Sequence, residues 1–285
     1  WHTSPVKTYK DLFSQDLVVG GVGTSTPMVT HPNLFRGLLG MRFNVIAGYL
    51  SGSEVDLAME RGEVKGRIDY TWFGLKQRRA NWLRDKKVNI LFQMGLRKAV
   101  DLPDVPLALD FARNDDERRI LETVFLSYEF GRPYMMAPGI PADRLAAMRK
   151  AFMDTMKDPK FVTDAAKSRL EVNPVAPEHL AQLVARAYQL PPALVQRITT
   201  LQAPVGKLAR VKFKTVKAVL GKRSKKGGFA ITINGGNRES IKLHPRRTKV
   251  KIGGKKARAK ALEPGMACTI AYLGNKTIAK SITCD

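Results

Sequence analysis

The sequence is short of the residue types that build metal centres. Its 285 residues contain two cysteines and four histidines, His2, His31, His179 and His244. The histidines lack the spacing of metal ligands, so each is expected to be a surface or capping residue. No run approaches the ~20 consecutive apolar residues that a membrane-spanning helix needs. The opening WHTSPVKTYKDLF lacks the order of basic, apolar and small residues that marks a signal peptide.

Signatures of nucleotide-dependent enzymes are also missing. After Gly21 and Gly23, Thr26 stands where a dinucleotide-binding fingerprint has its third glycine, and no phosphate-loop lysine follows. Glu60 and Glu63 could share a helix face, but a solvated helix end explains them better than paired acid and base catalysis. We therefore expect a protein that is not an enzyme, has no metal site and needs no cofactor.

Acidic residues are few, and their distribution divides the chain. The whole sequence has 49 Lys and Arg against 25 Asp and Glu, a formal net charge of +24. From Gly206 to Asp285 there are 21 basic against 3 acidic residues, whereas residues 1–205 hold 28 against 22. The helical pattern gives way to short alternating runs at the same point. The sequence thus predicts two modules, residues 1–205 and 206–285.

The stretch LVVGGVGTST, from Leu17 to Thr26, reads as a strand, a tight turn and a helix start. Glycines let the backbone turn sharply and approach a ligand, and hydroxyl residues cap the first helical turn. Pro27 suits an early helical position. Because a helix N-terminus has free N–H groups and partial positive charge, the turn is a candidate site for a carboxylate or phosphate. A capped turn without a ligand is the alternative.

Strand-like and helix-like segments alternate through the first module, which is typical of an α/β fold with a mostly parallel sheet. A helix is expected from about Ser53, and a basic helix in LKQRRANWLRDKK, with Leu75, Trp82 and Leu83 facing inward. Further strands are predicted at Arg42–Tyr49, Arg67–Trp72 and Val88–Met94. In such sheets ligands bind beyond the carboxyl ends of the strands, and LVVGGVG lies at such an end.

Helical patterns dominate the rest of this module. Asp115–Phe130 is predicted to be an amphipathic helix, followed by a short strand at Arg132–Ala137. After Pro141, the residues Leu145, Met148, Phe152 and Met156 recur at helical spacing, and the methionines are interpreted as core filling. Two further helices are expected near Pro177–Tyr188 and Pro192–Thr200.

A long combination of motifs carries a family resemblance. GVGTST, NLFRGLLGMRFNVIAGYLSGSEVDLAMERGEVKGRIDY, PDVPLALDFA, GRPYMMAPGIPADRLAAMRKAFMDTMKDPKF and LEVNPV follow one another in order. Together they resemble the extracytoplasmic solute receptors of tripartite tricarboxylate transporters. The similarity covers roughly residues 5 to 200. Residues 5–135 would correspond to the second lobe of a type II periplasmic binding protein, and residues 136–205 to helices of an incomplete first lobe.

The resemblance implies solute capture for transport. Such receptors have two lobes that close on small carboxylates, which they deliver to a membrane permease. By resemblance, the first turn (Gly23, Thr24, Ser25 and Thr26) and the second turn (Tyr49, Ser51 and Ser53) would face the ligand. The location would be periplasmic, with a signal peptide expected upstream of Trp1.

Three features of the sequence depart from the family. About a hundred residues of the first lobe have no counterpart, Leu50-Ser51-Gly52 replaces a common Pro-Gly turn, and a basic module follows.

Residues 206–285 contain short alternating runs between glycine-rich turns, which predict a small antiparallel barrel or sandwich. Cys268 and Cys284 lie on the arms of an expected hairpin at Gly274-Asn275. A two-residue turn would place Ser281 opposite Cys268, so a disulfide requires a bulge or a longer loop, and two free thiols are the alternative. An exported chain would favour the disulfide.

The charge of this module suggests a second function class. A basic surface can bind nucleic acid, anionic lipid or cell-surface polymer by displacing counterions. The module offers only Phe213, Phe229 and Tyr272 for stacking, so any such binding is expected to be weak and nonspecific. The alternative function is therefore a polyanion-binding or nucleic-acid-binding protein, and a merely solvated basic surface is a third possibility.

Overall fold

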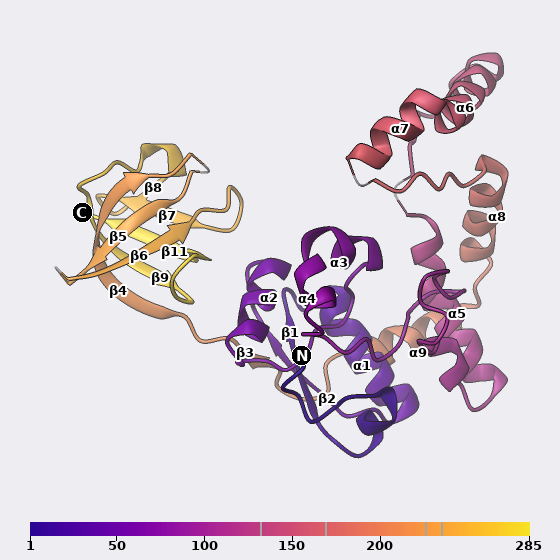
Figure 1. Ribbon diagram of the computed structural model, residues 1–285, viewed down its shortest axis with the longest axis horizontal. Coiled ribbons are helices and arrows are strands. Elements are labelled where there is room, and N and C mark those ends of the chain that lie inside the picture. Colours follow the sequence, from indigo (N-terminus) through magenta and orange to yellow (C-terminus); the bar gives the residue numbers. More distant parts are fainter. Residues whose placement is uncertain (132, 169, 226, 235) are drawn as a thin grey trace. The chain divides into compact units, whose positions relative to one another are not determined.

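The computed structural model describes residues 1–131, 133–168, 170–225, 227–234 and 236–285 (Figure 1). The chain is a mixed α/β protein that forms two compact units. The first unit consists of Trp1–Leu17, Thr30–Phe43 and Ile68–Ala203, and the second of Val18–Val29, Asn44–Arg67 and Pro204–Asp285. In the described part of the chain, no helix is long and apolar enough to cross a membrane.

A small sheet in the second unit carries the two predicted turns. Its strand order is β1-β2-β3, with bounds Leu17–Gly21, Phe43–Ala47 and Ala209–Arg210. Helix α1 (Pro27–Leu39) follows β1, and α2 (Gly52–Glu60) follows β2. β3 pairs in parallel with β2 although about 160 residues separate them, as Ile46 lies opposite Ala209. The predictions of strand, turn and helix at LVVGGVGTST and of a strand at Arg42–Tyr49 are confirmed.

Aromatic and aliphatic side chains form the core of the first unit. The predicted basic helix is present as two shorter ones, α3 (Trp72–Arg78) and α4 (Ala80–Arg84), and Leu75 and Trp82 are buried as expected. Helix α5 (Asp115–Glu129) confirms the predicted amphipathic helix, with Ile120, Leu121 and Phe125 fully buried. Helices α8 (Pro177–Tyr188) and α9 (Pro192–Gln202) contact α5 (Figure 1). Short 3-10 helices occupy Tyr9–Phe13 and Ala108–Phe111.

Helices α6 (Ala142–Lys157) and α7 (Pro159–Lys167) leave much of their apolar surface uncovered. No side chain of α6 is buried, and Met148 is 55% exposed, so the interpretation of its methionines as core filling is wrong. The strand predicted at Arg132–Ala137 is also absent over its described residues, and Arg132 lies outside them. Tyr134 and Met135 are exposed there. The helices formed as the apolar periodicity predicts, but Ala165 is the one buried side chain among the described residues of α6 and α7.

Two predicted strands are not formed. At Arg67–Trp72 the extended backbone ends early, because Asp69 adopts a left-handed conformation with φ of 62° and α3 begins at Trp72. Only an isolated bridge joins Val19 to Gly66. At Val88–Met94 the side chain of Gln93 instead donates to carbonyl oxygens of the loop that follows it. A strand requires a partner strand, and neither segment pairs with another over more than a single bridge.

An eight-stranded sheet occupies Lys214–Cys284 in the second unit (Figure 1). Its strand order is β10-β6-β5-β4-β9-β11-β7-β8, with parallel pairs at β10–β6 and β11–β7 and antiparallel pairs elsewhere. The bounds are β4 Lys214–Arg223, β5 Phe229–Ile233, β6 Asn237–Lys242, β7 Lys249–Ile252, β8 Lys255–Ala257, β9 Ala267–Tyr272, β10 Thr277–Ile278 and β11 Ser281–Cys284. A 3-10 helix spans Ala259–Ala261.

Alternate side chains of this sheet face a single apolar core. Leu220, Phe229, Ile231, Ile270 and Tyr272 are each at most 1% exposed. Their even spacing along β4, β5 and β9 is the period of two that a half-buried strand requires. The remaining side chains of these strands, among them Lys217 and Thr269, point to the other face.

Cys268 and Cys284 lie directly opposite each other in β9 and β11 and form a disulfide. A two-residue turn is excluded, because Ala271 pairs with Ser281 and a longer loop containing β10 connects the strands. Both cysteines are buried in the core of the eight-stranded sheet.

We expect the natively purified protein to have no alkylatable thiol before reduction and two after reduction. The disulfide closes a loop of about 15 residues, so removing it relaxes a constraint on the unfolded chain and lowers stability. Mass spectrometry after alkylation, with and without reductant, checks the pairing. Two thiols that react without reductant would contradict it and argue against an exported chain.

Candidate functional site

The two turns of the predicted site lie together at the carboxyl ends of β1 and β2. The N–H of Gly48 donates to the carbonyl oxygens of Gly21 and Val22 at 3.0 and 3.2 Å, and the N–H of Tyr49 also donates to Gly21. At the opposite ends of these strands, the N–H of Leu17 donates to Arg42 at 2.9 Å. The strands therefore run in the same direction, and the helices that follow them begin at one edge of the sheet.

Gly20 and Gly21 of β1 are needed for the packing of two helices against this strand, not for the approach of a ligand. A Cβ atom built on Gly20 would lie 2.6 Å from Cγ1 of Val55 in α2. One on Gly21 would lie 2.5 Å from Cγ2 of Val29 in α1. Both separations are far below contact distance, so the two helices can cover β1 only because these residues lack side chains. At Gly23, in contrast, a Cβ would meet only Thr26 at 3.5 Å.

The first turn presents hydroxyl groups and backbone N–H groups at the start of α1. Thr24 and Ser25 are exposed, and within the described ranges their N–H groups donate to no other residue. The hydroxyl of Thr26 donates to the carbonyl oxygen of Gly23 at 2.7 Å, so it stabilises the turn. Because α1 has 13 residues, its N-terminus can favour an anion. Thr24 and Ser25 are thus the available donors of this turn.

The second turn already contains a carboxylate of the chain itself. Ser51 caps α2 by accepting the N–H of Glu54 at 3.3 Å. The buried carboxylate of Glu54 accepts the N–H of Leu50 at 2.8 Å and that of Ile278 at 2.6 Å. Burial raises the pKa of this carboxyl, and the two N–H groups oppose the rise. Ser53, exposed in the first turn of α2, remains for a ligand.

Tyr49 lies below this surface. Its residue is 2% exposed, and its hydroxyl bonds to Glu63. Burial, followed by the negative charge of Glu63, raises the pKa of Tyr49 to about 12. The side chain therefore stays neutral and supports the second turn from inside.

A buried ion pair fixes the start of α2. Nη1 of Arg67 lies 2.6 Å from Oδ1 of Asp56, and the two side chains are 13% and 3% exposed. The same Nη1 donates to the carbonyl oxygen of Gly52 at 3.1 Å. A Cβ on Gly52 would lie 2.8 Å from Nη2 of Arg67, so glycine is needed for the guanidinium to approach. Arg67 thereby positions the turn that carries Ser51 and Ser53.

These groups suit one anion better than two. Neutral donors and a helix N-terminus converge at Thr24 and Ser25, whereas Glu54 adds negative charge at the second turn. A carboxylate therefore fits the first turn, and a hydroxyl or other neutral group fits beside Ser53. In the described part of the chain, no group of three or more His, Cys, Asp or Glu side chains could hold a metal ion.

Comparisons with known proteins found a likeness among solved structures and none elsewhere. No protein-family model matches the chain, and no curated protein matches it. Among solved structures, it is similar to a TctC solute binding protein from Polaromonas, solved without ligand. The two are 12% identical with a TM-score of 0.46, and the match covers 68% of this chain. It covers 63% of the Polaromonas protein, so the chain spans less than two thirds of that protein's length.

The sequence reasoning missed Glu54, Asp56 and Arg67. A signal for Glu54 was present, because Ser51-Gly52-Ser53-Glu54 has the S-x-x-E order of a capping box. Here the glutamate reaches the N–H of Leu50, one residue before the cap. The ion pair of Asp56 and Arg67 gave no such signal, since their 11-residue separation joins a helix to the segment after it.

Proposed function

We propose that this chain binds a small carboxylate as part of an extracytoplasmic solute receptor. The observation that carries the proposal is the convergence of the start of α1 with that of α2 at one sheet edge, where Thr24 and Ser25 are exposed. One carboxylate of the ligand accepts hydrogen bonds from Gly23 to Thr26, chiefly from the hydroxyls of Thr24 and Ser25. The other end of the ligand contacts Ser51 and Ser53.

The motif resemblance supports the finer parts of this proposal. The ligand would be a di- or tricarboxylate that places one carboxylate at the first turn and a neutral group, such as a hydroxyl, beside Ser53. The location would be periplasmic, and the partner would be the permease subunits of a tripartite tricarboxylate transporter. Residues 1–205 would supply the receptor region, and residues 206–285 a basic β module. The buried disulfide supports an extracytoplasmic location, because oxidising compartments favour disulfides.

Thr24→Val and Ser25→Ala should each weaken carboxylate binding about tenfold or more, because a hydrogen bond to a charged group contributes roughly 1.5–3 kcal/mol. Titrations with citrate, succinate and acetate, followed by the backbone amide signals in nuclear magnetic resonance spectra, measure the affinity and locate the binding site. The signals of Gly23–Ser25 should shift, and binding by this chain should be weak, in the millimolar range.

Thr163→Val provides the matched control. Thr163 lies in α7, is exposed and uses its hydroxyl within its own helix, so its loss should leave binding unchanged. If a carboxylate binds and neither Thr24→Val nor Ser25→Ala changes its affinity, the assignment of the first turn is wrong. Shifts confined to other elements would count against it equally.

A further inference from the structure

The outer face of the eight-stranded sheet carries a row of lysine and threonine side chains across five adjacent strands. Lys217 on β4 lies opposite Thr269 on β9, which lies opposite Thr283 on β11. Thr283 lies opposite Lys251 on β7, and Lys251 opposite Lys256 on β8. We call these five residues the lysine–threonine row. Four inter-strand steps give it a length of roughly 19 Å, which suits an extended polymer rather than one small ion.

The positive charge of this segment is open to solvent. Every described Lys and Arg from Gly206 to Asp285 is exposed. Among them, within the residues that the structure describes, Lys214 forms an ion pair, with Glu239 at 3.1 Å, and no other does. The charge is therefore available to a partner of opposite sign.

The pair of Lys251 and Lys256 points to an anion. Like charges directly opposite each other on neighbouring strands destabilise a sheet. Both side chains are exposed, and Thr283 lies next to Lys251, with Thr269 next to Thr283. The hydroxyls of these two threonines make no hydrogen bond within the described ranges. An anionic group bound along the row would relieve the repulsion and accept from these hydroxyls.

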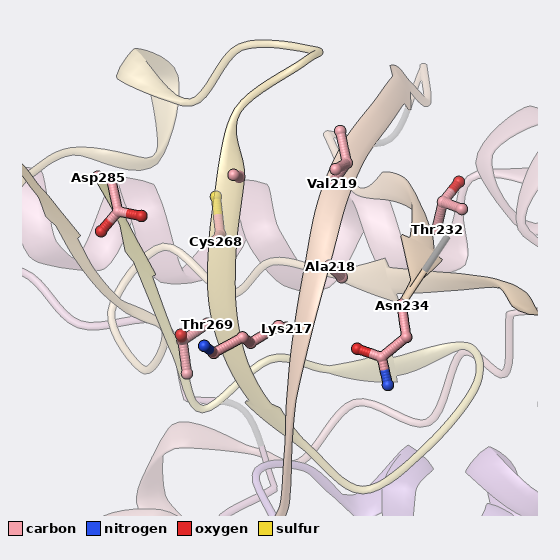
Figure 2. A pocket seen from close by; sticks show the side chains of 9 residues that line it. Lys217, Ala218, Val219, Thr232, Asn234, Cys268, Thr269 and Asp285 are labelled. Atoms are coloured by element: carbon pink, nitrogen blue, oxygen red, sulfur yellow. The ribbon is translucent and has the colours of Figure 1, made fainter. Parts of the chain in front are cut away.

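The row ends in a shallow hollow of about 240 Å³. Figure 2 shows Lys217 and Thr269 next to each other at this hollow. Asn234 and Thr232 line it as well, and Asp285 adds negative charge. Ala218, Val219, Ala267 and Cys268 complete the lining, so hydroxyl, amide and ammonium groups stand beside apolar surface. These polar groups suit sulfate and carboxylate substituents, and the apolar surface suits the carbon face of a sugar ring.

We propose that the lysine–threonine row binds a linear acidic polysaccharide. Nucleic acid fits less well, because single-strand binding relies on exposed aromatic side chains and Phe229 and Tyr272 are buried in the core. Phe213 is half-buried, with the ammonium of Lys280 4.6 Å from its ring centre. The disulfide favours a compartment where extracellular polymers occur. This partner is distinct from the small carboxylate proposed for the first turn.

Heparin titrated against the full chain at low and physiological salt tests this proposal. The triple variant Lys217→Gln, Lys251→Gln, Lys256→Gln should lower heparin affinity at least tenfold. It should also reduce the slope of log K against log salt by about two to three, since each lost contact releases about one counterion fewer. The same three positions changed to arginine should retain the affinity, which separates charge loss from any defect in folding.

A matched triple within the same segment provides the control. Lys207→Gln, Lys212→Gln, Lys225→Gln removes the same charge from exposed positions outside the row and should change affinity less than threefold. Equal losses in both glutamine triples would overturn the proposal, because binding would then follow total charge. It would also be overturned if heparin did not bind, or if a single-stranded oligonucleotide of equal charge bound more tightly.

Discussion

Arg67→Met should destabilise the second unit by about 3–5 kcal/mol, which is a large part of the stability of an ordinary domain. The guanidinium faces the carboxylate of Asp56 at 2.6 Å, and the Asp56 side chain is 3% exposed. Removing the cation takes away the positive charge that faces this buried carboxylate and offsets much of its desolvation cost. The variant also loses the hydrogen bond from Arg67 to Gly52, so the start of α2 should loosen.

Urea unfolding followed by circular dichroism measures this loss, and hydrogen exchange at the α2 amides locates it. The double variant Asp56→Leu, Arg67→Met should recover much of the stability, because replacing both partners of a buried ion pair by apolar groups is often nearly neutral. Lys150→Met breaks an exposed ion pair with Asp154 and should cost at most about 1 kcal/mol. Equal effects of Lys150→Met and Arg67→Met would contradict the argument.

Local sequence signals predicted the helices well, because a helix satisfies its own hydrogen bonds. Asp115–Phe130 has an apolar stripe at helical spacing, and Asn114 caps the resulting helix by accepting from Glu117. Strands were predicted less well, since pairing depends on distant residues. Nothing local at Arg67–Trp72 reveals that Asp69 turns the chain away from β1. Likewise, nothing local indicates that Ala209 and Arg210 pair with β2.

In the candidate site, too, local sequence predicted some features, and others depend on residues elsewhere in the chain. The start of α1 could be predicted from three hydroxyl residues before Pro27, and Thr24 and Ser25 are exposed there. The roles of Thr26 and Tyr49 could not, because they depend on a carbonyl oxygen at Gly23 and a carboxylate at Glu63. A hydroxyl in a motif indicates a possible donor, but only its neighbours decide whether it is available.

The stability of the first unit should depend on pH through His31. This residue was expected to be a surface or capping residue, but it is 5% exposed because α1 packs against α5. Its Nδ1 lies 3.0 Å from the hydroxyl of Tyr128, which donates to Asp69 at 3.2 Å. Since the hydroxyl has one hydrogen, we infer that Nδ1 of His31 is the donor to Tyr128. Burial lowers the pKa of His31 from 6.5 to about 4.

The lowered pKa of His31 determines whether acid stabilises or destabilises the first unit. Between pH 6.5 and about 4, the unfolded chain binds a proton at His31 and the folded chain does not. Acid therefore favours unfolding. The contribution of neutral His31 to the free energy of unfolding is fully present above pH 6.5 and is lost as the pH falls toward 4. The difference in pKa corresponds to about 3 kcal/mol over that interval.

His31→Asn should remove this dependence while keeping an N–H donor near Tyr128. Its free energy of unfolding should be lower at neutral pH, because the smaller side chain leaves space in the core, but it should fall less steeply on acidification. Unfolding in urea at several pH values, followed by tryptophan fluorescence, measures both effects, since Trp72 and Trp82 belong to the first unit. His179→Asn at an exposed position should leave the pH profile unchanged. If His31→Asn and the unmodified protein lose stability in parallel from neutral pH to pH 4, then His31 is not the group whose protonation unfolds this unit.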